Sequence, residues 1–155
     1  ETPAGARTVS VGTPLTMATR TAVPDAANLA RCRPVEANAA DPSAPAVAAV
    51  DGSTVTGWTP DTDPATPSTL TVRLDGTPTL AHATLTWLDA RPLAPYEVQV
   101  RSGGTWRTVA TVTATAELVD KVAFDPVAGD AVRLRIPATR FGGQNPKLAE
   151  LAVTG

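Results

Sequence analysis

The sequence predicts an all-β fold, a sandwich or barrel of antiparallel strands. From residue 70 onward, short runs alternate apolar and polar residues, and turn residues such as Gly, Pro and Asp separate the runs. A helical period is not sustained for more than a turn or two, and only residues 46–50 offer a short helical candidate. With 155 residues, the chain is long enough to form one domain with a sizeable core.

Seven strands are predicted in chain order, at residues 70–74, 83–87, 96–100, 106–110, 119–124, 131–136 and 148–153. Turns at 75–78 and 102–104 close the first and third strands, whereas Asp125-Pro126 and the segment 137–146 interrupt the later ones. Five aromatic residues take core-type positions in this pattern: Trp58, Trp87, Tyr96, Trp106 and Phe124. Phe141 is the one aromatic residue in a predicted loop.

Charge and cysteine content exclude several classes of function. The net charge of -2, the pI near 5.3 and the lack of a Lys/Arg-rich run argue against nucleic-acid binding. Cys32 is the only cysteine, so neither an intrachain disulfide nor a thiolate metal site is expected. No apolar run approaches the length of a membrane span, and a targeting signal is expected to have been removed or to lie upstream.

Residues 1–27 differ from the rest of the chain in composition and in strand pattern. They contain one strand candidate, residues 7–11, followed by a Thr-, Ala- and Pro-rich connection. We interpret 1–27 as a linker or the terminal strand of a preceding domain, and 28–155 as the β-sandwich domain.

The segment 51–58 combines a possible cation site with a core anchor. Asp51 can supply carboxylate oxygen, Gly52 permits a sharp turn, and Thr56 can add carbonyl or hydroxyl oxygen, which is the ligand chemistry of calcium. Trp58 would then fix the loop in the core. A plain alternative remains, in which Asp51 only caps its own turn through an Asx hydrogen bond.

Eight blocks in the right order resemble coagulation factor 5/8 type C (discoidin) domains, whose bacterial branch includes the family-32 carbohydrate-binding modules. The blocks are residues 28–37, 48–58, 70–74, 83–87, 96–100, 106–109, 132–134 and 149–155. The resemblance implies a jelly-roll β-sandwich, galactose-binding-domain-like, with ligand loops at one end. Cys32 stands where these relatives usually have Gly and is predicted to be a half-buried small residue.

The resemblance also implies a structural calcium ion, Ca2+. Its ligands would be the Asp51 side chain, the carbonyls of Ala48 and Ser53, the carbonyl and hydroxyl of Thr56, and Glu150 from the last strand. Ser53 departs from the more usual Asp, which matters little if only its carbonyl binds. Such a site would connect an early loop to the last strand.

A carbohydrate ligand, galactose-like or another glycan, is the further implication, and it needs an exposed aromatic platform with fixed polar groups. Phe141 is the candidate platform, and the candidate polar groups are Arg140, Gln144, Asn145 and Arg91. Two departures weaken a galactose site: Thr59-Pro60 follows Trp58 where a His is common, and the loop with Arg91 holds no Asn. Alternatively, Phe141 packs beneath its own loop.

No arrangement of residues favours an enzyme. The chain lacks a His suited to activate a nucleophile, a phosphate-binding Gly loop and a His-based metal set, and Asp61 and Asp63 fit a solvated loop. The resemblance therefore implies a non-catalytic carbohydrate-binding accessory domain of a larger bacterial glycoside-active enzyme, a glycoside hydrolase or phosphorylase, with the parent catalytic domain as its expected partner. Residues 5–11 weakly resemble the junction in family-65 enzymes.

Two alternatives stay open: a spacer domain that packs on the catalytic domain without sugar affinity, and a protein- or lipid-binding discoidin domain. The expected location is secreted or extracellular, or cytoplasmic if the parent is an intracellular family-65-type enzyme.

Overall fold

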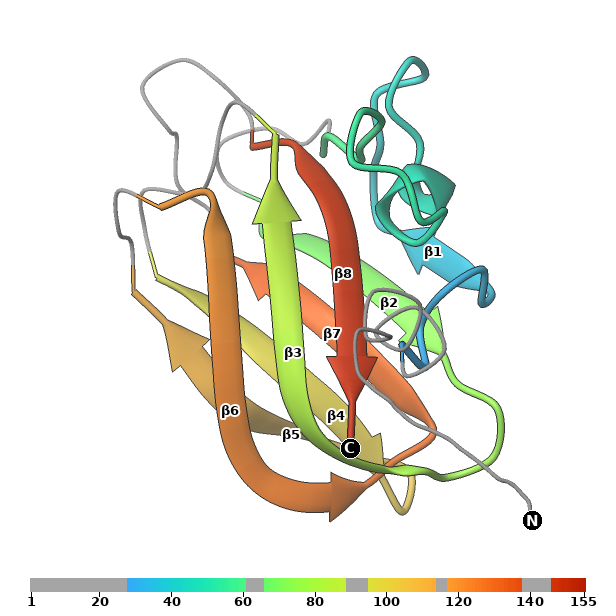
Figure 1. Ribbon diagram of the computed structural model, residues 1–155, viewed down its shortest axis with the longest axis vertical. Helices are drawn as coiled ribbons and strands as arrows, with labels where there is room; N and C mark the ends of the chain where they lie inside the picture. Colours follow the sequence, from blue (N-terminus) through green and yellow to red (C-terminus); the bar gives the residue numbers. More distant parts are fainter. Residues whose placement is uncertain (1–27, 61–65, 89–94, 114–116, 138–145) are drawn as a thin grey trace, which may run out of the picture.

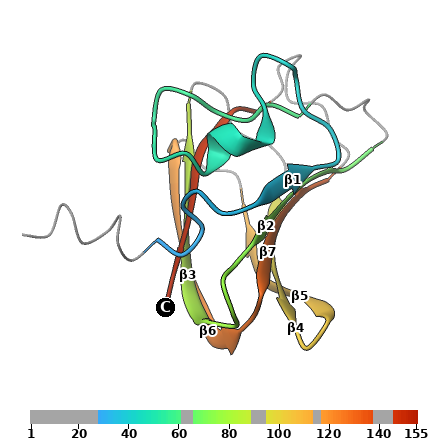
Figure 2. The same cartoon turned by 90° about the vertical axis from the view of Figure 1, so that its right-hand side faces the viewer.

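Two antiparallel sheets face each other and form a sandwich (Figure 1, Figure 2). The computed structural model describes residues 28–60, 66–88, 95–113, 117–137 and 146–155. In these ranges, the five-stranded sheet has the order β1-β2-β7-β4-β5 and the three-stranded sheet has the order β6-β3-β8. The predicted all-β sandwich is confirmed.

Most elements lie close to their predicted positions. Within the described residues, the strands are β1 Val35–Ala37, β2 Ser68–Arg73, β3 Thr79–Trp87, β4 Tyr96–Ser102, β5 Thr105–Val112, β6 Val119–Ala128, β7 Ala131–Ile136 and β8 Leu148–Thr154, and the short 3-10 helix η3 spans Ala46–Ala49. β1 was not predicted as a strand, because three residues are too few to show a period.

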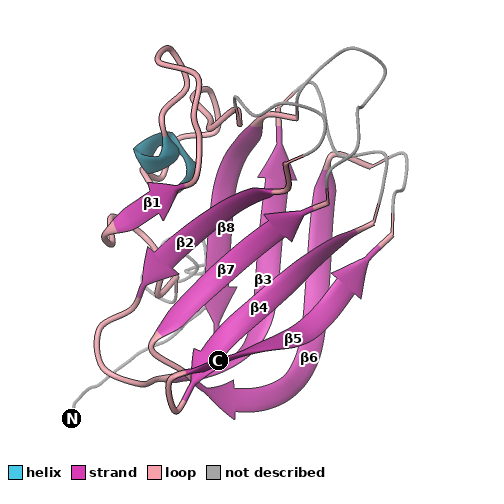
Figure 3. Cartoon of the chain, turned by 180° about the vertical axis from the view of Figure 1, so that it is seen from behind, coloured by secondary structure: helices cyan, strands magenta, loops and turns pink. Residues whose placement is uncertain are grey.

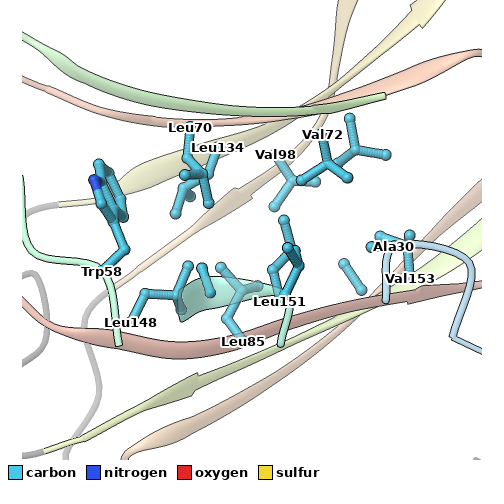
Figure 4. Close-up of a cluster of buried hydrophobic side chains, with 14 of the residues drawn as sticks. Ala30, Trp58, Leu70, Val72, Leu85, Val98, Leu134, Leu148, Leu151 and Val153 are labelled. Carbon is cyan, nitrogen blue, oxygen red and sulfur yellow. The ribbon is translucent and has the colours of Figure 1, made fainter. Parts of the chain in front are cut away.

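The core lies between the sheets and is built from the alternating inward side chains of both (Figure 4). Leu70, Val98 and Leu134 of the larger sheet lie opposite Leu85 and Leu151 of the smaller one, and all are at most 1% exposed. Removing these side chains from water is the main stabilising term of such a sandwich.

Trp58 fixes the long N-terminal connection to this core. Its side chain is fully buried, and its backbone exchanges two hydrogen bonds with Leu148 of β8, at 2.8 and 2.9 Å. The indole Nε1 donates to the carbonyl of Ala39 at 3.1 Å. The predicted role of Trp58 as a core anchor is confirmed.

Two details of the strand prediction are wrong. Asp125-Pro126 was expected to end a strand, but β6 continues through it. β6 is an edge strand, which pairs only with β3 among the described strands, and the pairing is irregular between Leu80 and His82. Proline is tolerated at such an edge position. Trp106 is not a core residue either. It lies opposite Arg101 of the neighbouring strand β4, and its side chain is half-buried on the outer face of the larger sheet.

Cys32 is exposed instead of half-buried. Its φ of 57° lies in the left-handed region, which favours glycine and explains why a glycine suits this position.

Candidate functional site

Asp51 organises the turn that follows η3. Its Oδ1 accepts a hydrogen bond from the Ser53 backbone N–H at 2.9 Å, and its Oδ2 accepts one from the Thr56 hydroxyl at 2.6 Å. The first contact is an Asx turn, which is the plain alternative for this residue. Gly52 has a φ of 82°, a conformation that a side chain would strain.

Glu150 of β8 connects this turn to Asn28, at the start of the described domain, and Asn28 in turn contacts the last strand. Its Oε1 accepts a hydrogen bond from the Gly52 N–H at 3.1 Å, and its Oε2 accepts one from Asn28 Nδ2 at 3.4 Å. Asn28 Oδ1 in turn accepts from the backbone N–H groups of Ala30 and Val153, at 3.0 and 3.1 Å. We call Asn28, Asp51, Gly52, Thr56 and Glu150 the Asp51–Glu150 cluster.

The positive charge of Arg31 packs against this cluster, a contact that was not predicted from the sequence. A Cβ added to Gly52 would lie 2.6–2.7 Å from the Nε, Cζ and Nη2 atoms of Arg31. The guanidinium of Arg31 therefore covers Gly52. Any residue larger than glycine at position 52 would have to displace it.

The donor set fits a hard cation in its chemistry. Asp51, Thr56 and Glu150, three of the five predicted calcium ligands, meet around Gly52 and offer only oxygen. Ala48 lies in η3, and Ser53 lies in the turn itself. In the described ranges, no group of three or more His, Cys, Asp or Glu side chains could hold a metal ion. The predicted set has only two carboxylates, so calcium here would depend on carbonyl and hydroxyl oxygen.

The strand ends define the end of the sandwich where the carbohydrate site was predicted. At this end β2, β4 and β8 begin, and β3, β5 and β7 end. The paired residues there are Ser68–Ile136, Trp87–Leu148 and Tyr96–Val112. The five predicted carbohydrate-binding residues belong to segments that leave from this end; Arg91, Arg140, Phe141, Gln144 and Asn145 themselves lie outside the described residues.

A buried polar cluster that the sequence did not reveal lies at the same end. Asp120 is 7% exposed, and its Oδ2 accepts hydrogen bonds from the Tyr96 hydroxyl at 2.5 Å and from Trp87 Nε1 at 3.1 Å. The two rings pack edge to face, with centroids 5.6 Å apart. These contacts hold the end of β3, the start of β4 and the start of β6 in fixed positions.

A groove of about 620 Å³ lies between the edge strands β5 and β6 and reaches Asp120. Small and β-branched residues line most of it, and none of its described lining residues is aromatic. A pyranose ring would find no stacking platform there. The groove is a weaker candidate for carbohydrate than the neighbouring loop end.

Comparison with known proteins identifies the type of domain. A family model described as an F5/F8 type C, NedA-like, galactose-binding domain matches residues 48–134. No curated protein sequence matches the chain. Within the described residues, no helix is both long and apolar enough to cross a membrane.

Several solved structures have the same fold. Chitosan-binding module 1 of a chitosanase/glucanase from Paenibacillus sp. IK-5 is 27% identical, with a TM-score of 0.74 over 83% of this chain and 98% of that one. Module 2 of the same enzyme, solved with chitotriose, is 28% identical, with a TM-score of 0.73 over 83% and 100% of the two chains. The family 32 module of Clostridium perfringens NanJ, solved with galactose, is 24% identical, with a TM-score of 0.69 over 79% and 93%. The predicted discoidin-type jelly roll is confirmed.

Proposed function

Because the chain belongs to the F5/F8 type C family of NedA-like, galactose-binding domains, we propose that it is a non-catalytic carbohydrate-binding accessory domain of a larger glycoside-active enzyme. One observation carries this proposal: the fold matches two chitosan-binding modules over 98% and 100% of their lengths. Those modules come from a chitosanase/glucanase, which supports a glycoside hydrolase as the parent, with a phosphorylase as the alternative. We propose a secreted location for this chain. A parent of the intracellular family-65 type would place the domain in the cytoplasm instead.

The proposed glycan site lies at the end of the sandwich where β3 ends and β4 begins. Phe141 supplies the stacking platform, and Arg91, Arg140, Gln144 and Asn145 supply hydrogen bonds to hydroxyl groups. The buried Asp120 cluster supports this location, since it fixes the strand ends from which the segment containing Arg91 departs. Rigid strand ends reduce the entropy that ligand-binding loops lose when a ligand binds.

A glycan array followed by calorimetric titration of chitotriose, galactose and the best array hit tests the proposal. We expect Phe141→Ala to abolish measurable binding. Asp75→Ala, in the exposed turn between β2 and β3 at the opposite end of the sandwich, should leave binding unchanged. If no glycan binds at millimolar concentration, the domain is a spacer or interaction module. If Phe141→Ala binds the best hit as tightly as Asp75→Ala does, the assigned location is wrong.

We further propose that calcium binds the Asp51–Glu150 cluster with the carbonyls of Ala48 and Ser53. Bound calcium would stabilise the fold by crosslinking the turn to β8, because a ligand that binds only the native state stabilises it. Arg31 would then lie beside a second positive charge, which makes a modest calcium affinity the expected result.

Thermal unfolding in calcium, magnesium and chelator tests this part. Calcium should raise the Tm more than magnesium does, and Glu150→Gln should remove the difference. Asp41→Asn is the matched control, because Asp41 forms a similar Asx turn, accepting from the Ser43 N–H and hydroxyl at 2.8 and 2.6 Å, in a neighbouring loop. Equal Tm values in calcium and magnesium for the unaltered protein would contradict a calcium site.

A further inference from the structure

The outer face of the five-stranded sheet carries four arginines, which are Arg73, Arg101, Arg133 and Arg135. No other described element covers this face (Figure 3). The strand register arranges the outward side chains in rows across the sheet. One row holds Arg73, Ala131, Arg101 and Trp106, the next Thr71, Arg133, Gln99 and Thr108, and the third Thr69, Arg135, Glu97 and Thr111. This concentration of guanidinium groups is local, because the chain as a whole has a net charge of -2.

Arg133, at the centre of the face, is held in a fixed position. Its Nε donates to Gln99 Oε1 at 2.7 Å, and its guanidinium carbon lies 4.1 Å from the centroid of the Trp106 ring. Gln99 is itself held by Glu97 and Thr108, at 2.9 and 3.2 Å. A guanidinium fixed by stacking and hydrogen bonding loses little entropy when it binds a ligand.

The four arginines differ in how their charge is compensated. Arg73 lies 3.5 Å from Glu36, and Arg101 forms a two-bonded pair with Asp130 at 2.8 and 3.2 Å. Arg133 and Arg135 make no ion pair with a carboxylate anywhere in the described part of the chain. Burial and the adjacent charge of Arg135 lower the pKa of Arg133, and Glu97 opposes this only in part. An anion bound here would relieve the repulsion between the two guanidiniums.

We propose that Arg133, Arg135 and Trp106 form a second ligand-binding surface, for a saccharide that carries carboxylate or sulfate groups. The planar guanidiniums suit the two-bonded recognition of such anions, and the exposed hydroxyl of Thr108 suits a neighbouring sugar hydroxyl. Trp106, half-buried and level with the arginines, offers apolar area to a sugar ring. This surface lies on the outer face of the sheet and does not depend on the proposed loop site. Trp106 and Arg133 lie farther along their strands, whereas Arg135 is one residue from the end of β7, where the loop site is proposed.

Titration of an acidic trisaccharide, trigalacturonate, beside neutral galactotriose and a sulfated galactotriose tests the proposal and separates carboxylate from sulfate recognition. We expect at least one acidic sugar to bind more tightly than the neutral one. Arg135→Gln should weaken this binding about tenfold, the effect of losing one charge-assisted hydrogen bond. Arg133→Gln and Trp106→Ala should weaken it as well, and added salt should weaken binding to the unaltered protein.

Arg107→Gln is the matched control, since it removes the same charge from β5. Arg107 pairs with the inward-facing Val100, so it projects from the opposite side of the strand to Trp106. Arg107→Gln should leave the affinity for the acidic sugar unchanged, and circular dichroism should show that every variant is folded. Equal affinity for the neutral and acidic sugars would overturn the proposal, as would equal losses in Arg107→Gln and Arg135→Gln. If no acidic sugar bound, the proposal would also be overturned, and the alternative occupant of this face would be an acidic protein.

The two proposals can fail separately. Loss of neutral-sugar binding in Phe141→Ala with no effect of Arg135→Gln supports the loop site. Loss of acidic-sugar binding in Arg135→Gln with no effect of Phe141→Ala supports the sheet surface.

Discussion

Replacing Asp120 by Ala should destabilise the domain strongly, because two buried donors would lose their carboxylate acceptor. Those donors are the Tyr96 hydroxyl, at 2.5 Å, and Trp87 Nε1, at 3.1 Å, from residues that are 1% and 2% exposed. Each buried donor left without this acceptor costs about 2 kcal/mol, so we expect a loss of about 4 kcal/mol in the free energy of unfolding. Total stabilities of single domains are about 5–15 kcal/mol, so the loss is a large fraction of the whole.

Urea unfolding followed by tryptophan fluorescence and circular dichroism measures this loss, provided that the slope of the transition stays constant. Tyr96→Phe removes only one donor and should cost about 2 kcal/mol, and the double variant should show a coupling of about 1–2 kcal/mol between the two sites. Asp75→Ala is the control, since Asp75 is exposed in the turn between β2 and β3 and should change stability by less than about 0.5 kcal/mol. If Asp120→Ala lost no more than Asp75→Ala, the hydrogen bonds of the buried cluster would not be stabilising, and the reasoning would be refuted.

Two other predictions test the larger sheet. Hydrogen bonds from Arg101 lower the pKa of Asp130, so this ion pair stabilises the fold above the pKa that Asp130 has in the unfolded chain, and its contribution disappears as the pH falls through the lower folded-state pKa. Arg101→Gln should therefore raise the pKa of Asp130 in a carboxyl NMR titration, and an unchanged value would contradict the pairing. Gly129→Ala should cost about 3 kcal/mol, since the added Cβ would lie 2.3 Å from Val100 Cγ1 and 2.8 Å from the Arg101 carbonyl oxygen. Gly76→Ala is the control: Gly76 has a φ of 68° and an added Cβ would meet no other atom within 4 Å, so we expect a loss of only about 1 kcal/mol. Equal losses in the free energy of unfolding, measured by chemical denaturation, would show that the close approach of β4 is not the reason for a glycine at position 129.

The period-two alternation predicted most of the fold because both sheets bury one face. β7 lies at the predicted residues 131–136, and the inward sets of β3 and β4 are buried as expected. In a strand at the edge of a sheet, the alternation of apolar and polar residues predicts the structure less well. Pro126 in β6 and Trp106 in β5 were misassigned because an edge strand tolerates proline and carries a large side chain on its outer face.

The functional residues were predictable only in part. The resemblance of 48–58 and 149–155 to discoidin domains led to the expected meeting of Asp51 and Glu150, and the Gly52–Glu150 hydrogen bond places them together. Nothing in the local sequence marks Arg31 or Asp120, because each acts through partners more than twenty residues away. The arginine face became visible only once the register had aligned β2, β7, β4 and β5.

Chemical-shift mapping of the amide and indole resonances during titration with chitotriose and galactose tests the central claim most directly. A carbohydrate-binding domain with its site at the loop end should show saturable shifts in the Trp87 indole N–H and the Tyr96 amide, where β3 ends and β4 begins. Gly76 and Gly103, in the turns at the opposite end of the sandwich, should not move. Saturable shifts confined to Gly76 and Gly103, or no shifts with any glycan at millimolar concentration, would contradict the account.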